Sequence, residues 1–383
     1  MKRDKIAAFL AYAICVMIIV VCVATAFGLA DSEPLATPDE VEAPVVEAEE
    51  TTPTPTAEPT STPTPTPTPE VEEEEEEDDG NPDDIVDYGN LVVYEGAGYE
   101  LYTYVDDVSK RYAAAVSSAK EKLGDSVNVY DMVIPLSSSI VLPKGLHDDI
   151  SSSDQEEAVG KIYDALSGDV VAVNIYDTLE EHDDEYIYFR TDHHWTALGA
   201  YYAYVEYCKA KGTEPASLDD FEEKTFEGFI GSFYNDTKDE SLAANPDTIV
   251  AYDVVADNTV CVSDDYNSEE GYYWKLISDV SDVDASVKYS TFAGADSTFV
   301  TITNNEITDG SACIIVKESF GNAFVPFLVN DYQNVYVVDY RYYQGNLYDL
   351  VAATGATDVI FCNNISMTRN NFLVANLETF VAK

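Results

Sequence analysis

The sequence predicts an α/β domain built around a parallel β-sheet. Apolar stretches rich in Val and Ile recur between residues 91 and 363, as expected for strands that are buried on both faces of a parallel sheet. Helical patterns separate several of these stretches, which indicates βαβ units. No internal repeat interrupts this alternation, so the strands and helices are expected to share one hydrophobic core.

The first 30 residues are predicted to be a transmembrane anchor or a signal peptide. Lys2, Arg3 and Lys5 precede an uncharged, mostly apolar run over residues 6–30. A helix of that length spans about 37 Å, enough to cross a hydrocarbon core of roughly 30 Å. The basic residues favour a cytoplasmic N-terminus, and the small residues at 28 and 30 leave signal-peptide cleavage open. We therefore expect either a single-pass membrane protein with an extracellular C-terminal domain or a secreted protein.

Residues 31–84 are predicted to form a disordered acidic linker. They hold twenty Asp and Glu residues and eleven of the sixteen prolines, with no Lys or Arg. Such a segment repels itself and favours an extended spacer. The whole chain has a net charge of −52, which excludes a nucleic-acid-binding role because nucleic acid is itself an anion.

Residues 85–383 are predicted to form the α/β domain. The expected strands are residues 91–94, 127–136, 169–176, 312–316, 334–340 and 358–363. The expected helices are residues 107–124, with Gly124 as a C-terminal signal, 152–168, and 196–212. The intervening residues, about 213–311, are rich in Asp, Asn, Ser, Thr and Tyr, and we expect a large irregular insertion there.

The four cysteines of this domain are not predicted to bind zinc or to do redox chemistry. They are far apart in the chain and include no CxxC pair: Cys208, Cys261, Cys313 and Cys362. An exported location permits disulfides, with three possible pairings, but buried free thiols are the simpler expectation.

The segment Thr191-Asp192-His193-His194-Trp195-Thr196 contains the first candidate site. Thr196 can cap the helix that follows, which places the Asp and both His residues in a loop. An Asp two residues from a His can orient the imidazole and stabilise the imidazolium, as a general base requires. Alternatively, these residues have only a structural or capping role.

Ser319 is the candidate nucleophile. It lies between an apolar strand at 312–316 and a helical run that starts near Gly321. A serine at a strand-to-helix turn exposes its Oγ, and its own N–H lies near the helix N-terminus, where an oxyanion is stabilised. The alternative is that Ser319 merely caps the helix.

These two segments resemble the DHHW family of exported bacterial proteins and, more distantly, the alginate O-acetylation proteins of the SGNH-hydrolase superfamily. The resemblance is carried by TDHHWTALGAYYAY (191–204) and IIVKESFGNAFVPFLVNDYQNVYVVDYRYY (314–343), with weaker similarity at 226–242 and 289–304. It covers most of residues 86–383. It implies a flavodoxin-like, SGNH-hydrolase-like parallel sheet flanked by helices.

By position, the resemblance implies a Ser-His-Asp triad. Asp192 would be the orienting acid, His194 the base and Ser319 the nucleophile, while His193 fills a variable position of the family motif. Glu318 departs from the superfamily pattern, which usually has Asp before the nucleophile. Residues that could support the site or stabilise an oxyanion are Asn322, Arg341, Gly294 and Asn363.

The implied function is an O-acetyltransferase or acetylesterase that acts on a cell-envelope or extracellular polysaccharide. No metal or organic cofactor is expected, and a transferase would need an acyl donor from a membrane partner. Two alternatives stay open. Asp192 and the two adjacent histidines could bind a metal ion, although neighbouring residues rarely coordinate one ion with good geometry. An inactive carbohydrate-binding module is suggested by the tyrosine-rich stretches 271–276 and 340–348.

Overall fold

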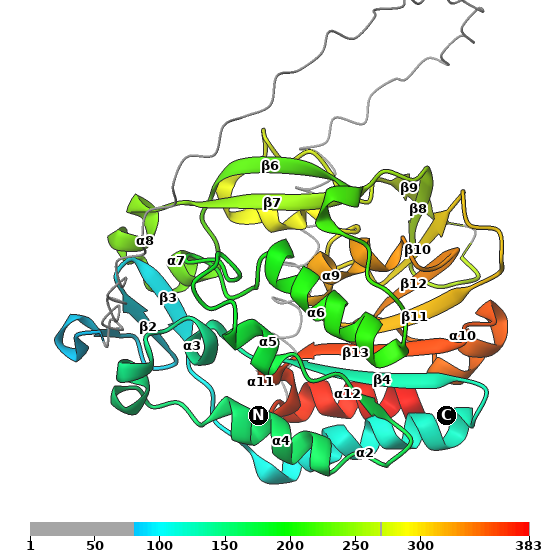
Figure 1. Ribbon diagram of the computed structural model, residues 1–383, viewed down its shortest axis with the longest axis horizontal. Helices are drawn as coiled ribbons and strands as arrows, with labels where there is room; N and C mark the ends of the chain where they lie inside the picture. The colour runs from blue at the N-terminus through cyan, green and yellow to red at the C-terminus, as the bar shows by residue number, and fades with distance from the viewer. Residues whose placement is uncertain (1–79, 269, 383) are drawn as a thin grey trace, which may run out of the picture. The chain divides into compact units, whose positions relative to one another are not determined.

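The computed structural model describes residues 80–268 and 270–382 (Figure 1). The expected membrane segment at 1–30 and nearly all of the expected linker at 31–84 lie outside the described residues. Among the helices that are described, none is both long enough and apolar enough to span a bilayer.

The main sheet has eight strands in the order β5-β4-β13-β11-β12-β10-β8-β9. The five strands from β5 to β12 run parallel, whereas β10, β8 and β9 continue the sheet with antiparallel pairing. The bounds of the parallel strands are Val171–Ala172 (β5), Asn128–Ile134 (β4), Asp358–Asn364 (β13), Ala312–Lys317 (β11) and Asn334–Asp339 (β12). Those of the antiparallel strands are Phe299–Asn304 (β10), Asn258–Ser263 (β8) and Tyr272–Trp274 (β9).

The predicted parallel sheet is therefore correct for one part of the sheet only. The antiparallel strands come from residues 258–304, which we expected to lie in an irregular insertion. Burial alternates along most of β8 and β10, and all three residues of β9 are exposed, whereas β4, β11 and β13 are buried over continuous runs. A half-buried strand of this kind is harder to distinguish from a polar loop.

Two other predicted strands differ from expectation. Residues 91–94 form β2 (Leu91–Tyr94), but β2 belongs to a separate antiparallel sheet with β1 (Val86–Asp87) and β3 (Ala97–Glu100). The apolar run 169–176 gives only the short β5, because Val171 and Ala172 are exposed and helix α5 (Tyr176–Glu180) begins soon afterwards.

The predicted helices are present, with shorter bounds at 152–168. They are α2 (Asp106–Leu123), α4 (Gln155–Asp164) and α6 (Ala197–Lys211). Gly124 ends α2 with a φ of +69°, and the Thr196 side chain accepts the N–H of Gly199 to cap α6. In Figure 1, α2, α4 and α12 (Asn371–Ala382) lie below strands β4 and β13, and α6 lies above them with α9 (Gly321–Leu328).

The parallel part of the sheet gathers three chain segments at one edge. Ser319 follows β11, Arg341 follows β12, and Asn364 is the last residue of β13. Because the carboxyl ends of parallel strands share one edge, these residues come close together although they are distant in sequence. The third sheet has two strands, β6 (Phe221–Phe229) and β7 (Asp247–Val254), and Asp247 of β7 accepts the N–H of Thr191 in the histidine loop.

The four cysteines are free, as predicted. Cys208, Cys313 and Cys362 are buried, and Cys261 is half-buried. Burial raises the pKa of all three buried thiols, so they stay protonated and pack as small apolar groups.

Candidate active site

Ser319 occupies a tight turn between β11 and α9. The N–H of Gly321 donates to the carbonyl of Glu318 at 3.0 Å, and the N–H of Asn322 donates to the carbonyl of Ser319 at 3.1 Å. A Cβ at position 321 would lie only 2.6 Å from the Cβ of Lys317. Glycine at 321 therefore lets the helix start directly against the end of the strand.

The carboxylate of Glu318 fixes this turn. One oxygen accepts the N–H of Phe320 at 3.1 Å and lies 3.3 Å from the hydroxyl of Ser319. The other oxygen accepts the N–H of Asn364 at 2.9 Å, which ties the turn to the end of β13. Burial raises the pKa of Glu318, while Arg341 and the two N–H donors act in the opposite direction. Glu318 thus ties the nucleophile turn both to Phe320 and to the end of β13.

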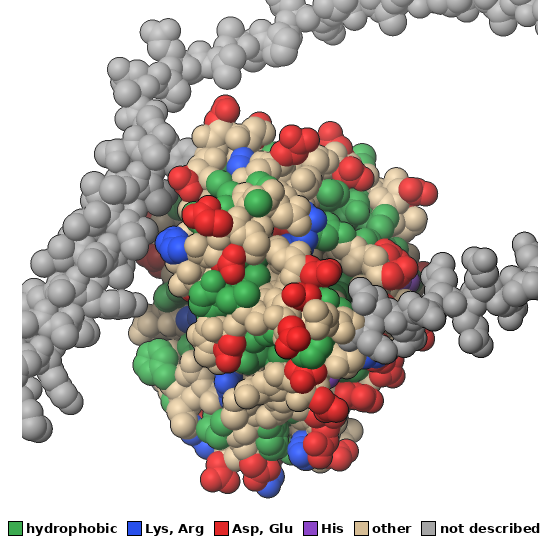
Figure 2. Space-filling view, turned by 90° about the vertical axis from the view of Figure 1, so that its left-hand side faces the viewer, with side chains coloured by type: hydrophobic (Ala, Val, Ile, Leu, Met, Phe, Trp, Pro, Cys, Tyr) green, Lys and Arg blue, Asp and Glu red, His purple; other side chains and the backbone are tan. Residues whose placement is uncertain are grey.

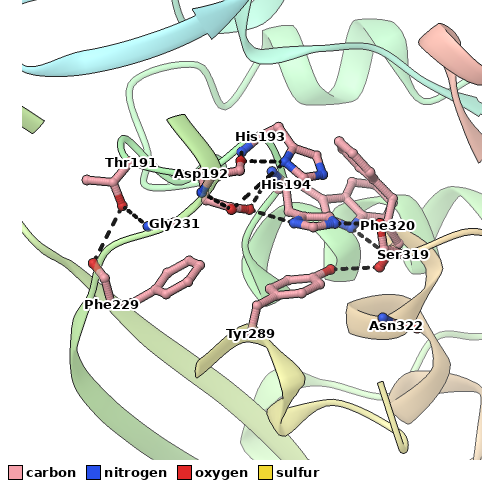
Figure 3. A network of polar contacts seen from close by, with 12 residues as sticks. Thr191, Asp192, His193, His194, Phe229, Gly231, Tyr289, Ser319, Phe320 and Asn322 are labelled. Carbon is pink, nitrogen blue, oxygen red and sulfur yellow. Dashed lines mark hydrogen bonds and ion pairs between the residues drawn. The ribbon is translucent and has the colours of Figure 1, made fainter. Parts of the chain in front are cut away.

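Asp192, His194 and Ser319 form a continuous hydrogen-bonded row (Figure 3). His194 Nδ1 lies 2.5 Å from Asp192 Oδ1, and His194 Nε2 lies 2.7 Å from Ser319 Oγ. Both side chains of the Asp-His pair are only 7% exposed. Since the carboxylate can only accept at Nδ1, the tautomer with Nδ1–H leaves Nε2 free to accept the serine hydroxyl.

Residues that follow β6 hold the loop of Asp192 in place. Asp192 Oδ1 accepts the N–H of His194 at 3.1 Å, and Oδ2 accepts the N–H of Ser232 at 2.8 Å. A Cβ at Gly231 would come within 2.2 Å of the Cβ of Asp192, so only glycine fits there. Burial alone would raise the pKa of Asp192, but His193, His194 and the Ser232 N–H together hold it well below its ordinary value.

Tyr289 supports the imidazole and the nucleophile together. Its ring stacks on His194 with centroids 3.9 Å apart and an interplanar angle of 10°. Its hydroxyl donates to the carbonyl of Ser319 at 3.0 Å (Figure 3). Trp195, which is fully buried, donates its indole N–H to the carbonyl of Phe320 at 2.9 Å. The histidine loop and the serine turn are therefore joined at several points besides the triad.

The buried carboxylate of Asp247 fixes the start of the histidine loop. It accepts the N–H and the hydroxyl of Thr191 at 2.7 and 2.5 Å. Arg190 donates Nε to the same carboxylate at 3.2 Å. Neither Asp247 nor Tyr289 was predicted from the sequence. Tyr289 lies in a stretch that resembles the family, but nothing in its local spacing relates it to residue 194.

A cavity of about 200 Å³ opens beside Ser319. Its polar lining comes from the ends of the parallel strands, from β3 and from the residues around α7 (Ser232–Thr237): Glu100, His193, Asp236, Arg341, Asn364 and Ser366. The nucleophile is thus reachable from solvent through a pocket that is mostly polar and acidic.

His193 and Arg341, both predicted to support the site, line this pocket. His193 Nδ1 lies 2.6 Å from Ser232 Oγ, and its ring centroid lies 3.9 Å from that of His194. Burial and the neighbouring His194 lower the pKa of His193. Arg341 is paired with Asp339 at 2.6 Å and with Asp296 at 2.9 Å.

Asn322 lies behind the nucleophile turn and not in the pocket. It accepts a hydrogen bond from the fully buried Lys317 at 2.6 Å and donates to Asp296 at 3.0 Å. A buried lysine needs such partners, because an unpaired buried charge is costly. Asn322 therefore stabilises the ionic network under the turn.

The two suggested oxyanion residues, Gly294 and Asn363, are not among the residues that line the pocket. Gly294 has a φ of +80° and sits against Val262 and Val300 on the antiparallel part of the sheet. Asn363 is fully buried and donates to the hydroxyl of Tyr112 at 3.4 Å. Neighbouring residues of a strand point to opposite faces, so the next residue, Asn364, lines the pocket instead.

The ligating atoms of Asp192, His193 and His194 lie within 4.8 Å of one another, the one such group found among the described residues. Oδ1 of Asp192 and both ring nitrogens of His194 are already hydrogen-bonded to each other and to Ser319. A metal ion would have to displace these bonds. The absence of a metal from the reaction stays a prediction.

Comparisons with known proteins agree with this fold. A family model described as DHHW protein matches residues 79–338. The crystal structure of a DHHW family protein from Eubacterium siraeum is 32% identical, with a TM-score of 0.71, over 77% of this chain and 97% of that one. The structure of Bacillus cereus PatB1 with a sulfonyl adduct is 18% identical, with a TM-score of 0.59, over 76% of this chain and 97% of that one. No curated protein matches. The chain belongs to the DHHW family, and its mixed α/β fold is SGNH-like.

Proposed function

We propose that this protein is an extracytoplasmic serine acyl-ester enzyme, either an O-acetyltransferase or an acetylesterase, and that it acts on a cell-envelope or extracellular polysaccharide. The row from Asp192 through His194 to Ser319 carries the proposal, because it joins an acid, a base and a nucleophile at hydrogen-bond distances of 2.5 and 2.7 Å. The PatB1 structure with a sulfonyl adduct, a fold relative, supports sulfonyl reagents as probes of this site.

In the first half-reaction Ser319 Oγ attacks the acyl carbonyl of the donor ester while His194 Nε2 takes the hydroxyl proton. Asp192 stabilises the imidazolium through Nδ1–H. The tetrahedral intermediate then expels the donor alcohol, which receives the proton from His194. An acyl ester on Ser319 remains.

In the second half-reaction a sugar hydroxyl or water attacks the acyl carbon of this ester. His194 Nε2 takes the proton of the attacking oxygen and returns it to Ser319 Oγ as the ester bond breaks. Transferase and esterase share every step and differ only in the acceptor. A transferase would take its acyl group from a membrane partner, since no activated acyl donor of the cytoplasm is at hand outside the cell.

Two donors are available for the negative charge on the tetrahedral oxygen. Within residues 80–268 and 270–382, no hydrogen-bond acceptor is paired with the backbone N–H of Ser319, which lies two residues before the start of α9. The side chain of Asn364 accepts the N–H of Ser366 through Oδ1, and no partner among these residues occupies its Nδ2. Both groups lie at the pocket, and such donors stabilise an oxyanion without reorganisation.

A catalytically inactive, carbohydrate-binding envelope module is the second candidate. Three consecutive aromatic residues on the edge strand β9 are exposed, namely Tyr272 (57%), Tyr273 (78%) and Trp274 (41%). Exposed aromatic faces can stack on sugar rings. Glycan binding by a protein with an unreactive Ser319 would favour this candidate.

The test has two parts. One sample of the purified protein is labelled with phenylmethylsulfonyl fluoride and analysed by intact mass. An unlabelled sample is assayed for release of p-nitrophenol from p-nitrophenyl acetate. We expect one adduct, located at Ser319 by peptide mapping, and turnover that EDTA does not change. Ser319→Ala should show neither. Equal turnover by the wild type and Ser319→Ala, with no adduct, would contradict an acyl-enzyme mechanism. Loss of turnover with EDTA would instead favour a metal at Asp192 and its histidines.

A further inference from the structure

The free charge in the pocket beside Ser319 is negative. Glu318 is buried, and both of its oxygens accept N–H donors of the chain. Arg341 is already paired with two carboxylates, Asp339 and Asp296. The side chains left to meet a ligand are therefore the carboxylates of Glu100 and Asp236, which both line the cavity.

Each of these carboxylates has an oxygen to offer. Glu100 is 25% exposed and accepts the hydroxyl of Ser366 through Oε1 at 2.8 Å. Through the same oxygen, Glu100 forms a salt bridge with Arg369 at 3.6 Å, and no partner among the described residues is bonded to its Oε2. Asp236 is exposed on α7, and in this part of the chain it forms neither a salt bridge nor a side-chain hydrogen bond.

Two uncharged side chains of the same pocket each have one atom to which no described residue is hydrogen-bonded. Asn364 is only 4% exposed, and its Nδ2 has no acceptor within the described ranges. His193 has Nδ1 at Ser232, while no residue of these ranges bonds to its Nε2. Asn364 Nδ2 is not one of the fully buried unpaired atoms of the described residues, so this N–H donor is open to a ligand or water in the pocket. The pocket thus offers one donor, one imidazole nitrogen and two carboxylates to a bound molecule.

Resting on the proposed acyl transfer, we infer that this pocket binds the acyl acceptor and that the acceptor is an uncharged or cationic sugar, not a uronic acid. Carboxylates accept hydrogen bonds from hydroxyl or ammonium groups and repel a carboxylate. The net charge of the chain has the same sign, with 72 Asp and Glu residues against 20 Lys and Arg, and Figure 2 shows more acidic than basic side chains on one face. A cavity of about 200 Å³ is smaller than typical ligand sites of roughly 300–1,000 Å³, so one unit of a polymer enters it.

In the transfer step, the acceptor hydroxyl lies between His194 and the acyl ester of Ser319. Its oxygen forms a bond to the acyl carbon, the Ser319 Oγ–acyl bond breaks, and the acceptor proton passes through His194 Nε2 to Ser319 Oγ. His193 and Glu100 hydrogen-bond the neighbouring hydroxyls of the acceptor and do not take the proton. No oxidant, metal or further reactant is needed.

The test uses small polyol acceptors of different charge, each with a 1,2-diol unit or its 2,3-equivalent, and the chiral acceptors are used as racemates. The purified protein is acylated with p-nitrophenyl acetate in the presence of glycerol, glycerate or 3-trimethylammonio-1,2-propanediol, whose quaternary nitrogen cannot be acylated. The acetylated products are quantified by mass spectrometry at constant ionic strength. For each enzyme variant, the amount of one acetylated product is divided by the amount of another. A change in the acylation rate affects both amounts equally and cancels.

We expect the wild type to transfer to glycerol and to the trimethylammonium diol roughly tenfold better than to glycerate, a size of effect typical of charges near a protein surface. The double variant Glu100→Gln/Asp236→Asn should reduce this preference severalfold. The matched control Glu121→Gln/Asp125→Asn removes two exposed charges at the C-terminal end of α2, beside the amino end of β4, and should keep the wild-type ratio.

Three results would overturn the inference: equal transfer to all three acceptors by the wild type, an unchanged ratio in the Glu100/Asp236 double variant, or hydrolysis without transfer to any polyol. Each of them leaves the proposed chemistry standing, because acyl-enzyme formation is read separately from the p-nitrophenol burst. A wild type without a Ser319-dependent burst would instead count against the proposed function, and the inference would fall with it.

Discussion

His194 Nε2 lies 2.7 Å from Ser319 Oγ, although 125 residues separate the two in the chain. The turn after β11 and the loop before α6 meet because Tyr289 and Trp195 bond to the backbone of the serine turn while Asp192 holds the imidazole. The contact is thus supported from several directions, and each support can be tested by substitution.

Removing any member of the triad should abolish turnover and leave the fold intact. We expect Ser319→Ala and His194→Ala each to lower kcat by about 10⁶-fold and Asp192→Asn by about 10⁴-fold, as for serine triads in general. His193→Ala should reduce kcat less, because its ring lies beside the row of hydrogen bonds and not in it. Steady-state kinetics and thermal melting of the same samples provide the check. If His193→Ala is the lethal change, the base has been assigned one residue too late.

Gly231→Ala should inactivate the protein by displacing Asp192. The added Cβ would meet the Asp192 carboxylate at 2.3 Å, and the φ of position 231 is −91°, so the effect is steric and not backbone strain. We expect a loss of activity of more than about 10²-fold. Gly160→Ala is the matched control, since its Cβ meets nothing within 4 Å, and it should be neutral or slightly stabilising. Equal activity of the two variants would show that the position of Asp192 is not critical.

Glu318→Gln should weaken the serine turn. The carboxylate accepts two backbone N–H groups, whereas the amide can offer only one acceptor oxygen and would direct its NH₂ at the other donor. We expect a loss of about 1–3 kcal/mol in the free energy of unfolding, together with a lower kcat. Urea denaturation and kinetics measure these two effects. Glu318→Asp keeps the charge and both acceptor oxygens. If Glu318→Gln is inactive and Glu318→Asp is partly active, the role of Glu318 is to accept hydrogen bonds with both carboxylate oxygens.

Asp131→Asn should change the dependence of stability on pH. Asp131 is fully buried, accepts the hydroxyl of Tyr112 at 2.6 Å, and burial raises its pKa to about 7. Since the folded-state pKa is above the ordinary value, the folded protein keeps a proton that the unfolded chain loses. Stability from this group is therefore present at pH 4 and is lost as the pH rises to 7, by up to about 4 kcal/mol.

Urea unfolding of the wild type and Asp131→Asn at pH 5 and pH 8 tests this expectation. The wild type should lose stability between the two values, and the variant should lose less, because asparagine has no proton to give up. Parallel behaviour of both proteins would mean that Asp131 is ionised in the folded state at both pH values.

Much of this site follows from local sequence patterns. Asp192 and His194 are two residues apart in a loop that Thr196 ends by capping a helix, and Ser319 stands between an apolar run and a helical run. Such patterns depend on hydrogen bonds and side-chain directions within a few residues, so the sequence displays them directly. The same holds for β4, β11, β12 and β13, whose continuous Val and Ile runs predict buried parallel strands.

Three features could be known only from the tertiary structure, because each depends on residues that are far apart in the chain: the supports of the histidine loop, the lining of the pocket and the antiparallel part of the sheet. Gly231, Asp247 and Tyr289 support the histidine loop from other elements, and no local spacing relates them to Asp192 or His194. The pocket is lined by Asn364 and not Asn363, because a shift of one residue along a strand reverses the face of the sheet. Strands β8, β9 and β10 have no continuous buried run, and only the pairing of β10 with β12, of β8 with β10 and of β9 with β8 shows that they extend the sheet. Local periodicity determines which elements form, whereas long-range packing determines which side chains meet.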